Sequence, residues 1–376
     1  MSIPPPVSVV MPTRNALPYL DEAVRSILGQ SHADFEFVIL DDGSDDGSRE
    51  RLRFWAAADR RIRLIEGERS LGPVGSSNLV VESARGAVIA RMDADDVSAP
   101  DRLERQLELL ALHHEAVLVG SVWEGIDRHG RRVREADWSK VGRNGFAAPF
   151  AHGSVMFRRE AFLRAGGYRR ETAYWEDLDL FLRMAAQGRV LVSTRPLYRH
   201  RFSETSTRLT SALPAVERAV DLMFRCRAAF ERGEDYQALL EPSSAQAHPA
   251  KLHPYTFLSI GFIPLWSGHR PRSLERLLRR GALRADPATL KALIWASWAA
   301  ISPRSLRKVM QGLLRLRNGR AAHRLEGEAA EWRPRLLPAR REPLSGSSAE
   351  PRGDGAHLSP GGAARLEAVL AGCRDS

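Results

Sequence analysis

Cysteine is nearly absent from this chain of 376 residues, which contains only Cys226 and Cys373. The two lie far apart and show no CxxC spacing, so the sequence predicts neither a disulfide scaffold nor a thiolate zinc site. Such sparse use of cysteine fits a reducing compartment best.

Long apolar runs are also absent, because no stretch reaches the roughly 18 residues that a membrane-spanning helix needs. The nearest, Leu290 to Pro303, is short, contains Lys291 and ends in proline, which predicts a buried or interfacial helix. The first residues lack a basic region followed by an apolar core, so we expect no secretory signal. Together these absences predict a cytoplasmic protein.

Acidic residues are too few to balance the basic ones, which leaves a formal net charge of +10 and a pI near 10.2. Residues 270–320 hold thirteen Lys or Arg against two acids, a local net charge of +11. Arginines on amphipathic helices suit peripheral contact with anionic lipid headgroups, and the alternative is a packed helical subdomain with solvated arginines. Four tryptophans accompany these arginines: Trp266, Trp295, Trp298 and Trp332. No recognition motif supports nucleic-acid binding, which we do not expect.

What is present in the first 200 residues is an alternation of β-branched runs with helical patterns. This alternation indicates a mostly parallel sheet covered by crossover helices. Apolar side chains share one face in Leu17–Leu28 and again in Arg102–Leu112, which predicts two amphipathic helices. Pro100 and Asp101 suit the start of the second helix. The expected strands are 7–11, 36–40, 61–65, 87–91 and 116–120.

Two changes of composition divide the chain. Near Pro196, and clearly beyond Ser203, the sequence becomes helical and rich in arginine. From about Pro334 it becomes rich in Pro, Gly, Ser and Arg, with too few large apolar side chains to offset the entropy of ordering. We therefore expect a sheet domain over residues 1–205, a basic helical extension over 206–333 and a disordered tail over 334–376.

Three carboxylates, Asp93, Asp95 and Asp96, directly follow the apolar run from Val88 to Met92. Like charges this close repel, and in a poorly solvated site they need a cation or hydrogen-bond donors. Ligands of open α/β sheets gather at the carboxyl ends of strands, so the trio suits a hard divalent cation that also takes phosphate oxygens. The trio also has a simpler explanation, because acids stabilise the start of a helix. The DDGSDDG run after the second strand has one as well, because Asp, Gly and Ser are common turn residues.

Five stretches, taken in order, resemble the inverting nucleotide-sugar glycosyltransferases of family 2, which have the GT-A fold. They are SVVMPTRN, FVILDDGSDDGS, GPVGSSNLVVESARGAVIARMDADD, HGSVMFRREAFLRAGGY and YWEDLDLFLRMAAQG, and the resemblance covers residues 5–205. It implies a Rossmann-like, mixed and mostly parallel sheet with helices on both faces, here followed by a helical C-terminal extension. It also implies inverting transfer of a sugar from a UDP-, GDP- or dTDP-sugar to a hydroxyl, with Mg²⁺ or Mn²⁺ as cofactor.

The resemblance places the nucleotide sugar against the loops that follow the strands. Asp42 would face the base, whereas Asp41 and Ser44 would shape the turn. Asn78 matches a polar position where the family usually has Arg-Asn, but Ser77 precedes it here. The residues implied to bind the nucleotide sugar are Pro12, Thr13, Arg14, Asp42, Asn78, Asp93 and Ala94.

The run Asp93-Ala94-Asp95 is similar to the family's DxD motif. By this similarity Asp95 would coordinate the cation, and Asp93 would bind the ribose side or reach the metal through water. His200 matches a family position that can reach the metal or the diphosphate. Asp96 would lie behind these residues.

The stretch WEDLDLFLRM is similar to the family's ED motif at a helix start. Such an acid could serve the reaction, because an attacking hydroxyl needs a base. The resemblance implies Asp177 as that base, with Glu176 beside it in the catalytic pair. The alternative is an acid-rich helix start with Leu178, Phe181 and Leu182 buried. Asp179 continues the helix, and we interpret it as a solvated or capping acid. The acceptor side would include Trp175, His152, Gly153 and Ser154, although His152 can equally be structural.

These features leave three functions open. Sugar transfer to a glycan or a lipid-linked glycan, as in polysaccharide biosynthesis, explains the whole set best. The alternatives are a catalytically silent GT-A domain that acts as a binding or assembly module, and a sugar nucleotidyltransferase. The last would need a Gly-rich phosphate loop after the first strand, and VVMPTRNALPYL contains no glycine.

Overall fold

The structure is a computed structural model that describes residues 7–134, 136, 148, 150–202, 213–240 and 328–332. The basic segment 270–320, the helix expected at Leu290–Pro303, Trp266 and the tail from 334 lie outside these residues. Within the described ranges, none of the helices has the length and apolar character that crossing a bilayer requires.

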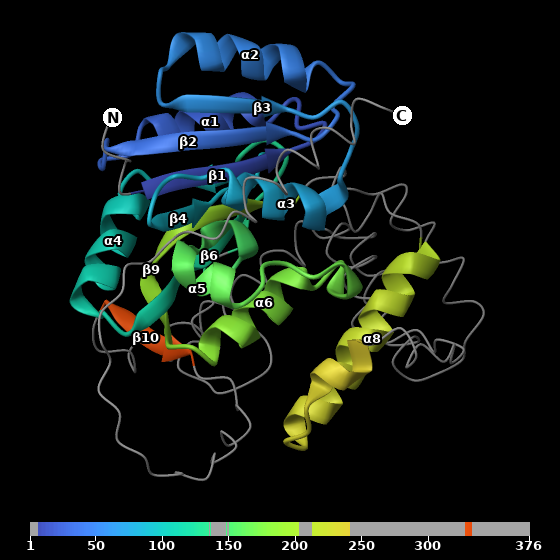
Figure 1. Cartoon of the computed structure of the whole chain (residues 1–376). Coiled ribbons are helices and arrows are strands. Elements are labelled where there is room, and N and C mark those ends of the chain that lie inside the picture. The colour runs from blue at the N-terminus through green and yellow to red at the C-terminus, as the bar shows by residue number, and fades with distance from the viewer. Residues whose placement is uncertain are drawn as a thin grey trace, which may run out of the picture. The chain divides into compact units, whose positions relative to one another are not determined.

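Ten strands of the described part form one mixed sheet (Figure 1). Its main path runs β10-β9-β6-β8-β4-β1-β2-β3, while β5 pairs with β9 and β7 pairs with β6. The strands are β1 (Val7–Thr13), β2 (Phe35–Asp41), β3 (Ile62–Glu66), β4 (Val88–Arg91), β5 (Val97–Ser98), β6 (Ala116–Ile126), β7 (Arg132–Arg134), β8 (Met156–Arg158), β9 (Arg189–Arg201) and β10 (Ala329–Trp332).

Strand β1 lies between β2 and β4 and runs parallel to both. The chain first moves outward from β1 to β2 and β3, and then returns to place β4 on the other side of β1. Such a reversal of strand order opens a crevice at the carboxyl ends of the strands. The antiparallel strand β8 joins β4 to β6, which runs parallel to β9.

The helices cover both faces of the sheet, because its strands alternate their side chains. Val9 of β1 packs with α1, α2 and α4, whereas the next residue, Val10, packs with α3, α5 and α6. The helices are α1 (Leu20–Leu28), α2 (Ser48–Ala58), α3 (Gly72–Glu82), α4 (Arg102–Leu112), α5 (Arg159–Arg164), α6 (Glu176–Ala185) and α8 (Leu213–Glu231). The described ranges also contain the 3₁₀ turns η2 (His152–Ser154), η3 (Arg170–Thr172) and η4 (Tyr236–Leu240).

The predicted fold class is confirmed, since the sheet is mixed and mostly parallel and carries helices on both faces. All five expected strands occur, and the helix expected over Arg102–Leu112 has those bounds. The other helix begins at Leu20 rather than Leu17. The change to helix near Pro196 was wrong, because β9 continues to Arg201 and a shift of its register on β6 absorbs the proline.

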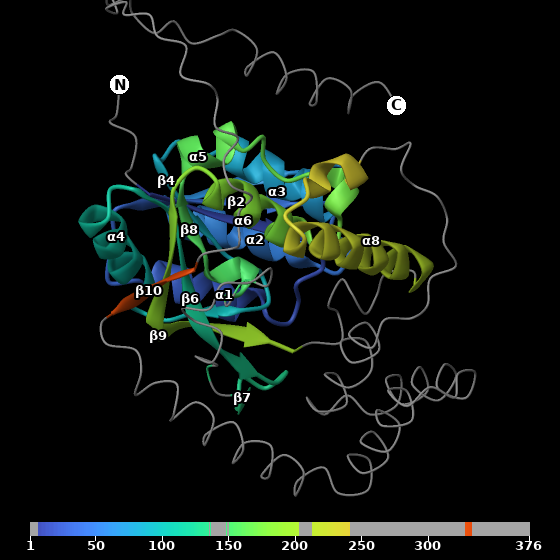
Figure 2. The ribbon, with the colours of Figure 1, turned by 90° about the horizontal axis from the view of Figure 1, so that it is seen from below.

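Of the two explanations for the arginines and their tryptophans, lipid contact and packing, packing holds for Trp332. Its side chain is 1% exposed and packs edge-to-face on Phe150, with ring centroids 5.8 Å apart. Trp332 ends β10, which pairs antiparallel with β9 at the side of the sheet (Figure 2). Residues late in the chain thus complete the core, while the domain limits drawn from the sequence stay predictions.

Candidate active site

The three carboxylates after β4 occupy a tight turn that leads into β5. Asp93 and Asp95 are half-buried, whereas Asp96 is buried. The backbone N–H of Asp96 donates to the carbonyl of Asp93 at 3.3 Å and closes the turn. The turn therefore presents two of the carboxylates at the carboxyl edge of the sheet and retains the third inside.

Asp96 holds the end of β9 against this turn. Its Oδ1 accepts the backbone N–H of Arg201 at 2.6 Å, and its Oδ2 lies 3.1 Å from Nδ1 of His200. Arg201 in turn donates to the carbonyl of Asp95 at 2.7 Å. These bonds place His200 beside the turn with Nδ1 engaged, which leaves Nε2 as the nitrogen that could reach a ligand.

Asp95, Asp93 and His200 differ in how far neighbouring charges offset the effect of burial on their pKa values. Burial raises the pKa of Asp95 to about 7, and the charges of Asp96 and Asp93 add to the rise. Burial also acts on Asp93, but the positive charge of Arg91, 3.0 Å away, brings its pKa below the ordinary value. Burial lowers the pKa of His200, but the charge and hydrogen bond of Asp96 outweigh it and raise the pKa to about 9.

Gly153 fits closely against this turn. A Cβ atom at Gly153 would lie 1.9 Å from Oη of Tyr198 and 2.7 Å from Oδ2 of Asp93, so no larger residue fits without a shift. Tyr198 accepts the backbone N–H of Asp93 at 3.2 Å, and Arg102 donates to the carbonyl of Gly153 at 2.7 Å. The missing side chain at Gly153 lets η2 approach the carboxylates.

The loops after β1 and β2 form the predicted nucleoside side. Thr13 is buried, Pro12 is half-buried and Arg14 is exposed. Asp41 accepts the backbone N–H of Ser44 at 3.3 Å, as expected for a turn-shaping residue. The side chain of Asp42 accepts hydrogen bonds at the start of α3, from the N–H of Leu71 at 2.6 Å and from the hydroxyl of Ser70 at 2.8 Å. Its contact with the base stays a prediction.

Asn78 and His152 meet at Tyr168. Asn78 on α3 accepts the backbone N–H of Tyr168 at 2.8 Å and donates to its carbonyl at 2.9 Å, so both ends of the amide hold the chain at that residue. The hydroxyl of Tyr168 lies 2.7 Å from Nε2 of His152. Burial and the charge of Arg91 lower the pKa of His152 to about 4, so the imidazole is neutral near pH 7. The predicted contact of Asn78 with the donor stays a prediction.

The predicted base lies in the first turn of α6, which begins at Glu176 as expected from the sequence. Asp177 is half-buried, and its Oδ1 accepts the N–H of Leu178 at 2.8 Å. Glu176 is half-buried, whereas Trp175 before it is 2% exposed and lies in the core. Ser154 is fully buried and donates to the carbonyl of Ala151 at 2.8 Å, so it supports η2 from behind.

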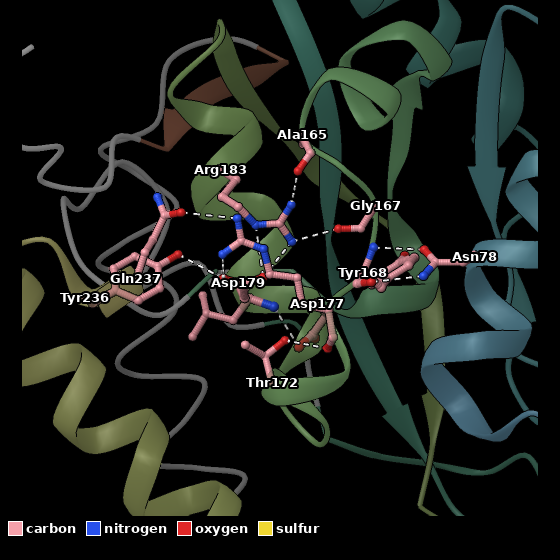
Figure 3. A network of polar contacts seen from close by, with 12 residues as sticks. Asn78, Ala165, Gly167, Tyr168, Thr172, Asp177, Asp179, Arg183, Tyr236 and Gln237 are labelled. Carbon is pink, nitrogen blue, oxygen red and sulfur yellow. Dashed lines mark hydrogen bonds and ion pairs between the residues drawn. The ribbon is translucent and has the colours of Figure 1, made fainter. Parts of the chain in front are cut away.

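The interpretation of Asp179 as a solvated or capping acid is wrong. The residue is fully buried and forms an ion pair with Arg183 one turn later, at 2.5 Å (Figure 3). Arg183 also donates to the carbonyl of Gly167 at 2.8 Å and to that of Ala165. This pair ties α6 to the connection that precedes it.

The two groups of carboxylates act on common neighbours. The charges of Asp93 and Asp177 both raise the pKa of His152 against the larger effect of burial, and both also act on Tyr168. The turn after β4 and the start of α6 therefore both lie within electrostatic range of the pair His152–Tyr168. The structure thus brings together carboxylates that are 84 positions apart in the chain.

Sequence reasoning missed three side chains of this region: Arg91, Tyr168 and Tyr198. The sequence does contain a signal for Arg91, because a charged residue stands at the end of an apolar run just before the carboxylates. Its side chain is buried and forms the ion pair with Asp93. Tyr168 ends one of the stretches that resemble the family, and Tyr198 lies outside them. Neither carries a pattern of its own, so their roles depend on packing.

Within the described ranges, no three His, Cys, Asp or Glu side chains are arranged so that they alone could hold a metal ion. Mg²⁺ and Mn²⁺ do not require such a cage, because one or two carboxylates with water and phosphate oxygens suffice. The residues present fit that requirement: Asp93 and Asp95 are oxygen donors in a turn where carboxylate charges repel, and Asp96 orients His200 from behind.

Comparison with known proteins gives a consistent family. A sequence profile described as Glycosyl transferase family 2 matches residues 8–164. EpsE of Bacillus subtilis (strain 168), which its name describes as a glycosyltransferase, is 32% identical over 257 residues, covering 66% of this chain and 92% of EpsE. WbnJ of Escherichia coli, named an O-antigen biosynthesis glycosyltransferase, is 31% identical over 184 residues, covering 47% of this chain and 71% of WbnJ.

Similar solved structures are more distant in sequence. The mannosyltransferase PcManGT from Pyrobaculum calidifontis, solved in complex with GDP-Man and Mn²⁺, is 20% identical and has a TM-score of 0.47. The comparison covers 86% of this chain and 87% of that one.

Proposed function

The chain belongs to glycosyltransferase family 2 and is a glycosyltransferase, and we propose that it moves a sugar from a nucleoside diphosphate to a hydroxyl group with inversion. One observation carries this proposal. Asp93 at the edge of the sheet and Asp177 on α6 belong to different elements, and the charges of both act on the same pair of side chains, His152 and Tyr168. A donor held at the first group would present its anomeric carbon toward the second.

The chemistry is a single displacement. The oxygen of the acceptor hydroxyl forms a bond to the anomeric carbon while the bond from that carbon to the diphosphate oxygen breaks. The hydroxyl proton passes to the carboxylate of Asp177, and the electron pair of the broken bond leaves with the nucleoside diphosphate. Because the acceptor attacks from the side opposite the leaving group, the configuration at that carbon inverts. Asp177 makes no hydrogen bond through its other oxygen to any described residue, so that oxygen is available to the hydroxyl.

We propose Asp95 and Asp93, together with Nε2 of His200 once it has released its proton, as the groups that would hold Mg²⁺ or Mn²⁺. A bound divalent ion would supply positive charge that stabilises the leaving diphosphate. The residues around the turn keep these groups in place, because Arg91 pairs with Asp93 and Asp96 fixes His200. Asp42, Thr13 and Pro12 would contact the nucleoside from the neighbouring loops, with Arg14 exposed beside them.

The acceptor we propose is a glycan or a lipid-linked glycan. The names of relatives point to such products, since WbnJ is named for O-antigen biosynthesis. The net charge of +11 over residues 270–320 would favour anionic lipid surfaces. Sedimentation with vesicles of phosphatidylglycerol and phosphatidylcholine, compared with phosphatidylcholine alone, tests the lipid contact. Equal binding to both vesicles would contradict it.

A thermal-shift panel tests the donor and the metal together. UDP-, GDP- and dTDP-sugars are added with and without Mn²⁺, and the donor that binds should raise Tm only when the ion is present. Asp95→Asn should abolish this shift, whereas Asp34→Asn, a change at an exposed acid far from the edge, should retain it. A shift that survives excess EDTA would contradict the metal, and no shift with any donor would contradict the proposed function. The anomeric configuration of the product, read by NMR, decides inversion.

A further inference from the structure

Residues 213–240 join the core that surrounds α6, although they follow the region that resembles the family. Cys226, Ala229 and Phe230 on α8 are buried in the same apolar cluster as Leu180 and Phe181 of α6. A sharp turn at Gly233, where φ is +79°, ends α8 and returns the chain toward that cluster. Tyr236 follows this turn and is 7% exposed.

Tyr236 completes the hydrogen bonding of Asp179, as Figure 3 shows. Oδ2 of Asp179 accepts from Nε and Nη2 of Arg183 at 3.0 and 2.5 Å, and Oδ1 accepts from the hydroxyl of Tyr236 at 3.0 Å. Among the described residues the next donor to Oδ1 is Nη1 of Arg169, which is 4.0 Å away. Burial and the charge of Asp179 raise the pKa of Tyr236, so its hydroxyl keeps the proton that it donates.

The same network reaches the acceptor side. Arg183 holds the carbonyl of Gly167, which precedes Tyr168, the partner of Asn78 and His152. Arg169 donates to the side chain of Gln237, next to Tyr236, at 3.2 Å. Three segments therefore share one buried acid: α6, the connection over residues 165–172, and η4.

Asp177 and Asp179 lie on opposite sides of α6. Residues two apart in an α-helix are separated by about 200° around its axis. Asp179 is accordingly buried and bonded to Tyr236, whereas Asp177 is half-buried and turned away from that contact. A bond that fixes the inner side of the first turn also fixes the direction in which the outer side presents Asp177.

From these contacts we propose that Tyr236 is a positioning residue for the transfer reaction, which acts through Asp179 to hold the first turn of α6 and its base Asp177. The segment over residues 213–240 is then part of the catalytic unit. This inference rests on the proposed function, because it assigns Asp177 to the reaction. A general base must be placed within a fraction of an ångström, so a loosened first turn lowers turnover more than it lowers donor binding.

The test compares Tyr236→Phe with the wild-type chain. The readout is release of nucleoside diphosphate from the donor found in the thermal-shift panel, with water as the nucleophile, so that no acceptor need be known. We expect a fall of about tenfold in kcat, with KM for the donor and the donor-induced rise in Tm unchanged. Hydrogen exchange of the amides of residues 177–180 should become faster.

Two further variants separate positioning from loss of stability. Cys226→Ala truncates a buried side chain of α8 that lies in the same apolar cluster as Tyr236, and it removes no hydrogen bond to Asp179. We expect both Cys226→Ala and Tyr236→Phe to lower Tm, but Cys226→Ala should leave kcat near the wild-type value. Adding Tyr236→Phe to Asp179→Asn should lower kcat little further, because the hydroxyl acts through that carboxylate.

The outcomes are distinct. Unchanged kcat in Tyr236→Phe, or an equal fall in Cys226→Ala, would overturn the inference. If no donor of the thermal-shift panel raises the Tm of the wild-type chain, the proposed function fails. In that case hydrogen exchange still tests the contact, and unchanged exchange over residues 177–180 in Tyr236→Phe would overturn the inference independently.

Discussion

The two clusters of acids in this protein, DADD after β4 and EDLD at the start of α6, look alike in sequence but differ in their surroundings. In the first cluster, carboxylates repel one another, and burial with neighbouring charges raises the pKa of Asp95 to about 7. In the second, Asp179 is buried, and both its oxygens accept hydrogen bonds. The comparison teaches that a carboxylate available for chemistry and one that holds the fold together can stand two residues apart.

The largest effect should come from Asp177→Asn, which removes the proposed base and leaves the neighbouring network intact. We expect turnover to fall by about 10²- to 10⁴-fold, the usual contribution of general base catalysis. Donor binding, measured by the shift of Tm with nucleotide sugar, should stay nearly unchanged. Glu171→Gln, at an exposed acid of η3, is the matched control. Substantial turnover in Asp177→Asn would remove this residue from the mechanism.

Asp179→Ala should instead reduce stability. It leaves the guanidinium of Arg183 buried without its acid, and breaking such a pair costs about 3–5 kcal/mol. Urea unfolding followed by circular dichroism measures the loss, and Glu66→Ala, which breaks the exposed pair with Arg53, should cost far less. The double variant Asp179→Ala/Arg183→Met should recover part of the stability. A loss as small as that of Glu66→Ala would mean that the two clusters do not differ as described.

Gly153→Ala probes the place where η2 meets the carboxylates. The added Cβ would overlap Tyr198 and approach Asp93, and overpacking of this kind costs about 1–3 kcal/mol. We expect a lower Tm and a smaller donor-induced shift, because Asp93 must move. Gly29→Ala, where φ is −89° and the only close contact is at 3.2 Å, should change neither. An unchanged Tm in Gly153→Ala would contradict the overlap.

Asp59→Asn should have the smallest effect, since it lies at the end of α2, away from both clusters. Hydrogen bonds from Arg61 lower the pKa of Asp59 below its ordinary value of 3.8, so ionised Asp59 stabilises the folded chain. This contribution, about 1 kcal/mol after solvent screening, should be present above about pH 4 and lost as the pH falls through the lowered pKa. Urea unfolding of wild type and Asp59→Asn should therefore differ at pH 7 and converge at low pH, with turnover equal at pH 7. A constant difference would contradict this account.

The position of Asp42, Asp93 and Asp95 at the edge of the sheet could be predicted, because these acids follow closely on strands. Period-two runs fix those strands, and parallel strands bring their carboxyl ends to one edge. Asp93 and Asp95 accordingly stand where the sequence placed them. Asp41 shapes its turn as expected, because turn chemistry is local.

The network around α6 could not be predicted, because its partners lie far apart in the chain. Asp179 and Tyr236 are separated by 57 positions, and Asn78 and Tyr168 by 90. Three acids at a helix start look the same whether they meet solvent or a buried arginine. The strand that ends at Trp332 could not be predicted for a related reason. Its four residues are too few to show the alternation of a strand, and they follow an arginine-rich region with helical patterns.

Strand β10 has a practical consequence for anyone who shortens this protein. Its four residues cover the backbone of Val190–Ser193, and Trp332 fills the space beside Phe150. A chain ended at residue 240 would retain α8 and Tyr236 but expose the amides and carbonyls of β9, which could then pair with another copy. Shortened versions should therefore be checked for self-association, and those that rejoin residues 328–332 to the shortened chain should stay monodisperse.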